Sequence, residues 1–151
     1  MEPAAYPIRK REIMKIPTAL AELDRAECLR LLGTAAVGRI VFTEGALPAI
    51  RPVNFLLDGD DVVFRTATGS ALAAATRHAV VAFEVDEIDT VAHTGWSVVV
   101  LGQAYEIADI DRLVRLAGPD HAPWVPHRSA HTIAIPICHI SGCRLVLQAP
   151  T

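Results

Sequence analysis

The sequence predicts a mostly β, single-domain protein built as an antiparallel barrel or sandwich. First, a length of 151 residues is that of one ordinary domain. Second, segments rich in Val, Ile and Phe recur at short intervals and are separated by polar turns. Third, helix signals are confined to short stretches, so the regular strand–helix alternation of βαβ units is missing. With 52% hydrophobic residues, a globally disordered chain is excluded.

The N-terminal stretch differs from the rest of the chain. Residues 1–17 contain three prolines and a basic cluster between positions 9 and 15. We expect this stretch to form an arm outside the domain, which then covers residues 18–151. Its charge does not predict a nucleic-acid site, because the whole chain has a net charge of -3 and lacks a basic helix interleaved with aromatic residues.

Local signals predict three helices and seven strands. The helices are expected at residues 24–32, where Asp24 is the N-cap and Gly33 the end, at 70–77, capped by Ser70, and at 109–117. The strands are expected at residues 37–43, 49–57, 62–66, 79–87, 96–107, 132–140 and 144–147. Gly59 supplies the positive φ of a hairpin turn at 58–61, and Ser141-Gly142 is expected to join the last two strands.

The strand at residues 49–57 contains a proline. Pro52 has no N–H to donate to a neighbouring strand, so it favours a sheet edge or a bulge. An edge leaves backbone N–H and C=O groups free for a planar ligand, and Asn54 adds a side-chain amide. The alternative is an edge that is merely protected against aggregation.

The segment 64–72 has the composition of an anion site. A strand ends in a short loop that contains Gly69, and a helix begins at Ser70. Helix N–H groups and the permanent charge of Arg65 would both favour phosphate. The hydroxyls of Thr66 and Ser70 could complete such a cradle. A plain N-cap serine beside a solvated arginine is the alternative.

The segment 96–105 combines an aromatic residue with a glycine in a long apolar strand. Gly102 is typical of a bulge or of a bend at a barrel corner. Trp96 either stacks on a flat ligand or fills the core or an interface.

The order and spacing of these segments resemble the FMN-binding split-barrel family, the pyridoxamine 5′-phosphate oxidase-like flavoproteins. The likeness is greatest to their short, nitroimidazole-reductase-like members and covers roughly residues 19–147. The segments that carry it are Gly38-Arg39-Ile40, Pro52-Val53-Asn54-Phe55, Phe64-Arg65-Thr66 followed by Gly69-Ser70, the run at 81–86, and Trp96-Ser97-Val98 with Gly102.

The resemblance implies a six-stranded antiparallel split β-barrel of Greek-key type that forms a homodimer, with a flavin at each of two interface clefts. It assigns Arg51, Pro52, Val53 and Asn54 to the isoalloxazine ring, Arg65, Thr66, Ala67, Gly69 and Ser70 to the phosphate, and Trp96 and Val98 of the partner to the closing wall. Ala71 stands where members of the family often carry a phosphate-binding lysine. Weaker FMN binding, the deazaflavin F420 as the cofactor, or loss of the cofactor therefore remain open.

The expected function is that of a cytoplasmic, FMN-dependent oxidoreductase acting on a small organic substrate. The alternatives are an F420-dependent reductase and a non-catalytic flavin- or heme-binding protein. No acid–base residue is required, because the cofactor carries the redox chemistry. His121, Trp124 and His127 are candidates for the substrate side. The final residues 143–151 do not match the arginine-containing tail of true pyridoxamine phosphate oxidases, so that substrate is not expected.

Several classes of protein are not expected. Three cysteines make no disulfide framework and favour a reducing compartment. Strand alternation would place Cys138 and His139 on opposite faces, which does not suit a metal site. No apolar run reaches the ~18 residues that cross a membrane, and no signal peptide opens the chain.

Overall fold

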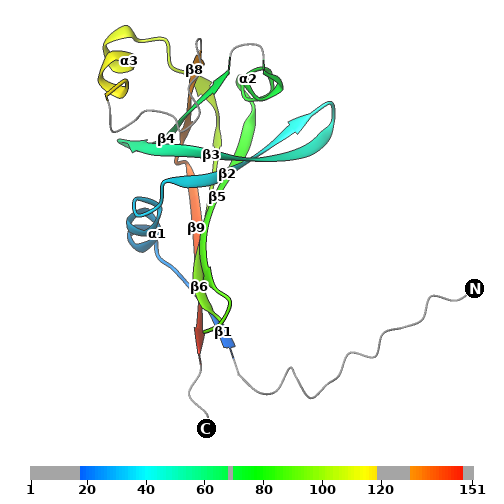
Figure 1. Ribbon diagram of the computed structural model, residues 1–151, viewed down its shortest axis with the longest axis vertical. Helices are drawn as coiled ribbons and strands as arrows, with labels where there is room; N and C mark the ends of the chain where they lie inside the picture. The colour runs from blue at the N-terminus through cyan, green and yellow to red at the C-terminus, as the bar shows by residue number, and fades with distance from the viewer. Residues whose placement is uncertain (1–17, 68–69, 119–129, 148–151) are drawn as a thin grey trace, which may run out of the picture.

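The computed structural model describes residues 18–67, 70–118 and 130–147 (Figure 1). Its described part is mostly β, with nine antiparallel strands in one sheet and three short helices. The strands are β1 (Thr18–Glu22), β2 (Val37–Glu44), β3 (Leu47–Asp58), β4 (Asp61–Ala67), β5 (Val80–Asp89), β6 (Thr94–Gln103), β7 (Tyr105–Glu106), β8 (Ala130–Pro136) and β9 (His139–Leu147); the helices are α1 (Arg25–Leu32), α2 (Ala71–Ala75) and α3 (Ile110–Leu116). The predicted class is confirmed, whereas the count of six strands is not.

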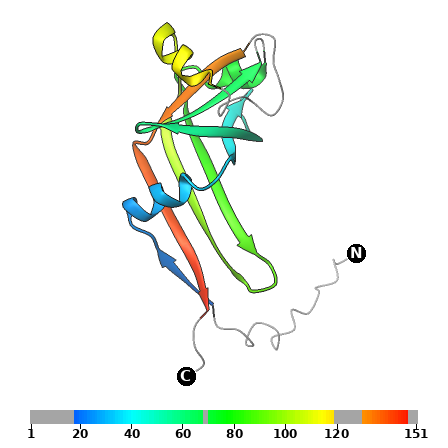
Figure 2. The same cartoon turned by 60° about the vertical axis from the view of Figure 1, so that its left-hand side comes forward.

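The strands follow the order β1-β9-β6-β5-β2-β3-β4-β8-β7, and the two end strands are not paired with each other. Only Ala104 separates β6 from β7 in the chain, yet β6 pairs with β5 and β7 pairs with β8. The sheet therefore has to curl, so that β6 passes from one part of it to the other. Figure 2 shows β5, β6 and β9 side by side as a long ribbon that extends beyond the layer of β3, β4 and β8.

The main core lies on the inner face of the curled sheet. Alternate residues of β2, β5 and β6 point inward, among them Ile40, Phe83 and Val98, each 0% exposed. Phe83 packs edge-on against Phe55, with 4.8 Å between ring centroids, and a Cβ at Gly38 would clash with its ring. A smaller apolar cluster lies beneath α3 and consists of Val63, Ile107, Leu116 and Ala134.

The predicted helix caps at Asp24 and Ser70 and the predicted hairpin turn at residues 58–61 are confirmed. The Asp24 carboxylate accepts a hydrogen bond from the N–H of Glu27 at 2.8 Å, and α1 follows directly. Ser70 caps α2 in the same way, although that helix ends at Ala75, earlier than predicted. In the hairpin, Asp58 pairs with Asp61 across Gly59, whose φ is 59°.

Three local predictions are wrong, and one strand was missed. The strand expected at residues 132–140 is two strands, because β8 ends at Pro136 and β9 begins at His139. Ser141 and Gly142 do not form a turn. Both lie within β9, where Ser141 pairs with Val99 of β6 and the pairing of the two strands continues through Gly142. Gly142 is needed there for close packing, since a Cβ would lie 2.7 Å from the Cys28 sulfur. The predicted strand at 96–107 is interrupted at Ala104, where the chain passes from β6 to β7. Strand β1 was not predicted at all, because its pairing partner β9 is more than 120 residues away.

Gly102 lies just before this passage, as a corner position requires. A Cβ there would clash with the backbone oxygen of Pro136 on β8, so β6 approaches β8 closely at this point. Within residues 18–67, 70–118 and 130–147, no helix has the length and apolar character needed to cross a membrane. The expected arm at 1–17 lies outside the described residues, as do His121, Trp124 and His127.

Candidate functional site where two strands separate

Strands β3 and β4 are paired at one end and apart at the other. Residues 55–58 pair with residues 61–64 around the hairpin. Beyond that point residues 47–54 pair with β2 instead, and the end of β4 pairs with β8. Each strand therefore leaves its partner for a different neighbour, and a gap opens between them.

A cleft of about 300 Å³ occupies this gap. It is lined by three residues of β3, three of β4 and two at the start of α2: Arg51, Pro52, Val53, Arg65, Thr66, Ala67, Ser70 and Leu72. Seven of these eight are residues that the sequence predicted to hold a cofactor. The ring-side and the phosphate-side groups, predicted from separate segments, thus meet in one place. Leu72 was not predicted; it is 6% exposed, and its only sequence signal is the apolar face of α2.

The β3 side of the cleft is a free strand edge. Pro52 is opposite Arg39 of β2, and within the described ranges no strand pairs with residues 47–54 on their other side. The prediction that Pro52 marks an edge is confirmed. Backbone groups of residues 51–53 therefore have no ladder partner on the cleft side, as hydrogen bonding to a planar ligand requires.

The cleft contains two cations and no carboxylate among its lining residues. Arg51 is half exposed and lies 3.8 Å from Glu44, a loose surface pair. Arg65 donates through Nη2 to the carbonyl oxygen of Leu116 at 3.0 Å. This contact uses one of its five N–H donors. The local charge is positive and suits an anion.

Two hydroxyls complete the polar lining. Thr66 Oγ1 and Ser70 Oγ share a hydrogen bond of 2.9 Å, and Ser70 Oγ accepts from the N–H of Ala73 at 3.0 Å. The sequence interpretation gave much of the anion binding to the helix that begins here. Because α2 has only five residues, its macrodipole is small, and the arginines and hydroxyls are the stronger groups.

Other predicted residues lie elsewhere. Asn54 pairs with Val37, is half-buried and does not line the cleft. Val98 is 0% exposed in the core of its own chain, so the surface of the chain does not present it to a partner, contrary to the role that the resemblance implied. Trp96 is 8% exposed and lines a separate hollow of about 570 Å³ between the ends of β5, β6 and β9. Gly69 lies outside the described residues, and Ala71 is the first residue of α2.

His131 is the described histidine that lies nearest in register to the cleft. It pairs with Thr66 across β4 and β8, and its Nδ1 is hydrogen-bonded to Glu106, but it does not line the cleft. Among the residues that the structure describes, no three His, Cys, Asp or Glu side chains are grouped so that they could hold a metal ion.

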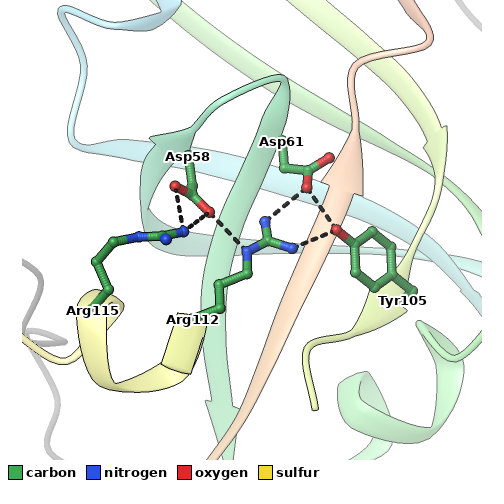
Figure 3. A network of polar contacts seen from close by, with 5 residues as sticks. All are labelled: Asp58, Asp61, Tyr105, Arg112 and Arg115. Carbon is green, nitrogen blue, oxygen red and sulfur yellow. Dashed lines mark hydrogen bonds and ion pairs between the residues drawn. The ribbon is translucent and has the colours of Figure 1, made fainter. Parts of the chain in front are cut away.

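Sequence reasoning missed a polar network at the paired end of β3 and β4 (Figure 3). Arg112 of α3 donates three hydrogen bonds of 2.8 Å. Nε donates to the carboxylate of Asp58, Nη2 to that of Asp61, and Nη1 to the phenol oxygen of Tyr105. The Tyr105 hydroxyl donates to Asp61 at 2.6 Å, and Arg115 reaches Asp58 at 3.3 Å. The two aspartates had been interpreted only as turn residues, and no local signal connects them to α3.

The network is partly buried, and its pKa values reflect mutual neutralisation. Burial acts to raise the pKa of Asp58, but the hydrogen bond and charge of Arg112, with help from Arg115, outweigh it and lower that pKa. The hydrogen bond with Tyr105, followed by those with the aspartates, raises the pKa of Arg112. Burial and the hydrogen bond to Asp61 raise the pKa of Tyr105. Each of these three shifts favours the ordinary charge state of its group at neutral pH: Asp58 ionised, Arg112 protonated and the Tyr105 phenol neutral.

The fold and the cleft together define a class of protein. A family model described as pyridoxamine 5′-phosphate oxidase matches residues 24–144, which is most of the chain and includes every residue that lines the cleft. The chain belongs to this family.

Three similar proteins come from species of Mycobacterium and Corynebacterium. The chain is 41% identical over 137 residues to an uncharacterised protein of Mycobacterium tuberculosis, covering 87% of this chain and 90% of the relative. A solved FAD binding protein from Mycobacterium smegmatis is 32% identical, with a TM-score of 0.66 over 83% of this chain and 98% of that one. A conserved protein of unknown function from Corynebacterium diphtheriae is 34% identical, with a TM-score of 0.69 over 84% of this chain and 98% of that one.

Proposed function

We propose that the cleft between β3 and β4 binds a flavin and that the protein is a flavin-dependent oxidoreductase acting on a small organic substrate. The observation that carries the proposal is the meeting, in one cleft, of a free strand edge with two arginines and a hydroxyl pair. The FAD binding protein from Mycobacterium smegmatis, at 32% identity, supports a flavin as the ligand.

The lining residues fit the two chemically different parts of a flavin. Its phosphate would be held by Arg65, Thr66 and Ser70, with Arg51 as the second positive charge. Its flat ring would lie along residues 51–53, whose edge N–H and C=O groups match the polar rim of the ring. Lysine is absent at position 71, so the two arginines take over its electrostatic role.

When bound, a flavin supplies reversible hydride or electron transfer. The contribution of the chain is to bind and orient it and to limit the access of water. FMN is the cofactor that the family resemblance implies. FAD contains the same phosphate-bearing FMN portion, so the charges of the cleft suit both, and a titration decides between them.

We further propose that the cofactor site is completed in a homodimer. A volume of about 300 Å³ is at the lower limit of the roughly 300–1,000 Å³ of small-molecule sites, and a second wall would enlarge the enclosure. The outer face of the sheet carries an apolar row in direct cross-strand register, which is unusual for a surface in water: Ile50, Val41, Ala82 and Leu101. Ile50 is 64% exposed and Leu101 is 42% exposed.

A second copy of the chain would cover this row by two-fold symmetry. The variant Leu101→Glu places a charge in the row and is expected to give monomers in sedimentation equilibrium, whereas Val114→Glu, on the exposed face of α3, is the matched control and leaves the dimer intact. If the wild-type chain is monomeric at about 50 μM, the dimer is contradicted.

The flavin proposal is tested by absorption and fluorescence titration of the purified chain with FMN, FAD, F420 and hemin. Quenched flavin fluorescence with saturable binding of FMN or FAD is expected. The variant Arg65→Ala removes a cation of the cleft and is expected to weaken flavin binding. Its control for loss of charge is Arg77→Ala, which removes a half-exposed arginine outside the cleft. Binding of F420 or hemin with no binding of either flavin would replace the cofactor assignment. No binding of any of the four would overturn the proposal.

A non-catalytic flavin-binding protein is the second candidate. It is favoured by one observation: the only ionisable side chains lining the described cleft are two arginines, which do not exchange protons near neutral pH. Flavin-loaded protein that stays oxidised with NADH, NADPH and reduced F420 would favour this candidate over the oxidoreductase.

A further inference from the structure

We propose that Arg112 is a positioning residue for anion recognition: through α3 it fixes the carbonyl group that orients Arg65 in the cleft. This inference rests on the proposed flavin site and adds a structural support to it. The chain of contacts runs from the hairpin aspartates to Arg112, along α3 to Leu116, and from the Leu116 carbonyl to Arg65.

The contact between Arg65 and α3 is directional. Leu116 is the last residue of α3, and carbonyl groups in the last turn of a helix have no partner within the helix. The Leu116 oxygen accepts from Arg65 Nη2 at 3.0 Å. A guanidinium is planar, so holding one of its terminal nitrogens restricts the plane of the whole group. The remaining donors of Arg65 are then presented at a fixed angle to the cleft, which Arg65 lines together with Thr66 and Ser70.

The position of α3 depends on Arg112. The apolar cluster of Leu116 with Val63 and Ala134 holds the helix against the sheet, but apolar contacts are not directional and allow small rotations. Arg112 uses all three of its nitrogens on groups from the hairpin and from β7 (Figure 3). Three bonds of 2.8 Å in different directions fix both the rotation and the height of α3.

Arg115 provides a matched comparison on the same helix. Its side chain is 65% exposed and lies 3.3 Å from Asp58 Oδ2. The same oxygen accepts a shorter bond, of 2.8 Å, from Arg112. Losing Arg115 leaves the three bonds of Arg112 in place. Exchanging either arginine for methionine keeps an unbranched apolar stem and removes the same guanidinium charge, so the pair separates positioning from charge.

The first experiment compares FMN, which has a phosphate, with riboflavin, which has none. Arg112→Met is expected to weaken FMN binding roughly three- to tenfold and riboflavin binding less than twofold, because one charge-assisted bond to phosphate is misaligned. Arg115→Met is expected to change either affinity less than twofold. In an Arg65→Ala background, Arg112→Met is expected to have no further effect on FMN. Equal loss for both ligands, or full additivity with Arg65→Ala, would overturn the inference.

A second readout needs no flavin and therefore separates this inference from the proposed function. The NMR order parameter of the Arg65 Nε–H group is expected to be high in the ligand-free wild type and to fall in Arg112→Met but not in Arg115→Met. The milder variant Tyr105→Phe, which removes one of the three partners of Arg112, is expected to give a smaller fall. An unchanged order parameter in a folded Arg112→Met protein would overturn the positioning role even if no flavin binds.

Discussion

The two ends of the β3–β4 pair contain similar charged groups in opposite situations. At the hairpin end, Arg112 donates to two aspartates and a phenol at 2.8 Å, and the side chains of Arg112 and of both aspartates are only about one-fifth exposed. At the separated end, Arg51 has a loose partner at 3.8 Å and Arg65 has one backbone carbonyl. The difference teaches that a satisfied charge holds the fold together, whereas a cation with spare donors beside a free strand edge is available to a ligand.

The largest expected effect is at the satisfied end. Arg112→Met leaves Asp58 and Asp61, each about one-fifth exposed, without their main counter-charge. We expect the free energy of unfolding to fall by about 3 kcal/mol, in line with breaking a largely buried ion pair. Urea denaturation measures it. Arg115→Met is the control and should cost less than about 1 kcal/mol, as an exposed pair does. Equal losses in the two variants would show that coverage of the charges is not what matters.

The next effect is at the open end and is on affinity. Arg65→Ala is expected to weaken FMN binding roughly 10- to 100-fold, because a hydrogen bond to a charged group contributes about 1.5–3 kcal/mol. Its unfolding free energy should change by less than about 1 kcal/mol, since the side chain makes one hydrogen bond among the described residues. Isothermal titration and denaturation of the same sample measure both. If Arg65→Ala loses stability and keeps its affinity, the phosphate has been placed wrongly.

A smaller effect is expected when a charge is added to the open end. Ala71→Lys restores the cation that members of the family often carry after the Gly-Ser pair, and we expect FMN to bind about fivefold more tightly. Riboflavin, which lacks the phosphate, should bind as before. Fluorescence titration with both ligands measures the difference, and Ala74→Lys, on the exposed side of α2, is the control. Tighter binding in both variants would indicate a general effect of charge and would leave position 71 without a special role.

The smallest effect concerns Arg39, which has two carboxylate partners, as Arg112 has, but is half exposed, as Arg51 is. Arg39 lies 3.4–3.5 Å from Glu84 and Asp86 on the outer face of the sheet. Burial, followed by the hydrogen bond and charge of Asp86, raises the pKa of Glu84 from 4.5 to about 7, while Arg39 opposes the rise. The folded protein therefore binds this proton more tightly than the unfolded chain does. The resulting stabilisation is present at low pH and is lost as the pH rises from about 4.5 through 7.

The comparison of Glu84→Gln with wild type at fixed protein concentration tests this sign. The wild type is expected to lose more unfolding free energy between pH 5 and pH 8 than the variant does, because only the wild type has the Glu84 carboxyl that gives up its proton in this range. Denaturation curves at the two pH values measure it. Identical pH dependence of the two proteins would contradict the raised pKa.

Signals that act within a few residues were sufficient for the parts of the fold that are local. Asp24 and Ser70 cap their helices because a side-chain oxygen needs to reach only three residues along the chain. Gly59 turns the hairpin because its φ is positive, and alternation placed Ile40 and Phe83 inside. Seven of the eight cleft residues were found through the order of the motifs and the resemblance that this order carries, not by any one motif.

From the sequence alone, then, came the class of fold, the helix caps, the hairpin turn at residues 58–61, and most of the residues that line the cleft. The tertiary structure was needed to show that β3 leaves β4 for β2, that β9 runs through Ser141-Gly142, and that Val98 is enclosed in the core of its own chain. It also decided the support behind Arg65, since Arg112 and Asp61 are 51 positions apart. The physical reason is range: caps and turns are set by neighbours in the chain, whereas strand partners and buried ion pairs are set by the packing of segments that meet only in the folded protein.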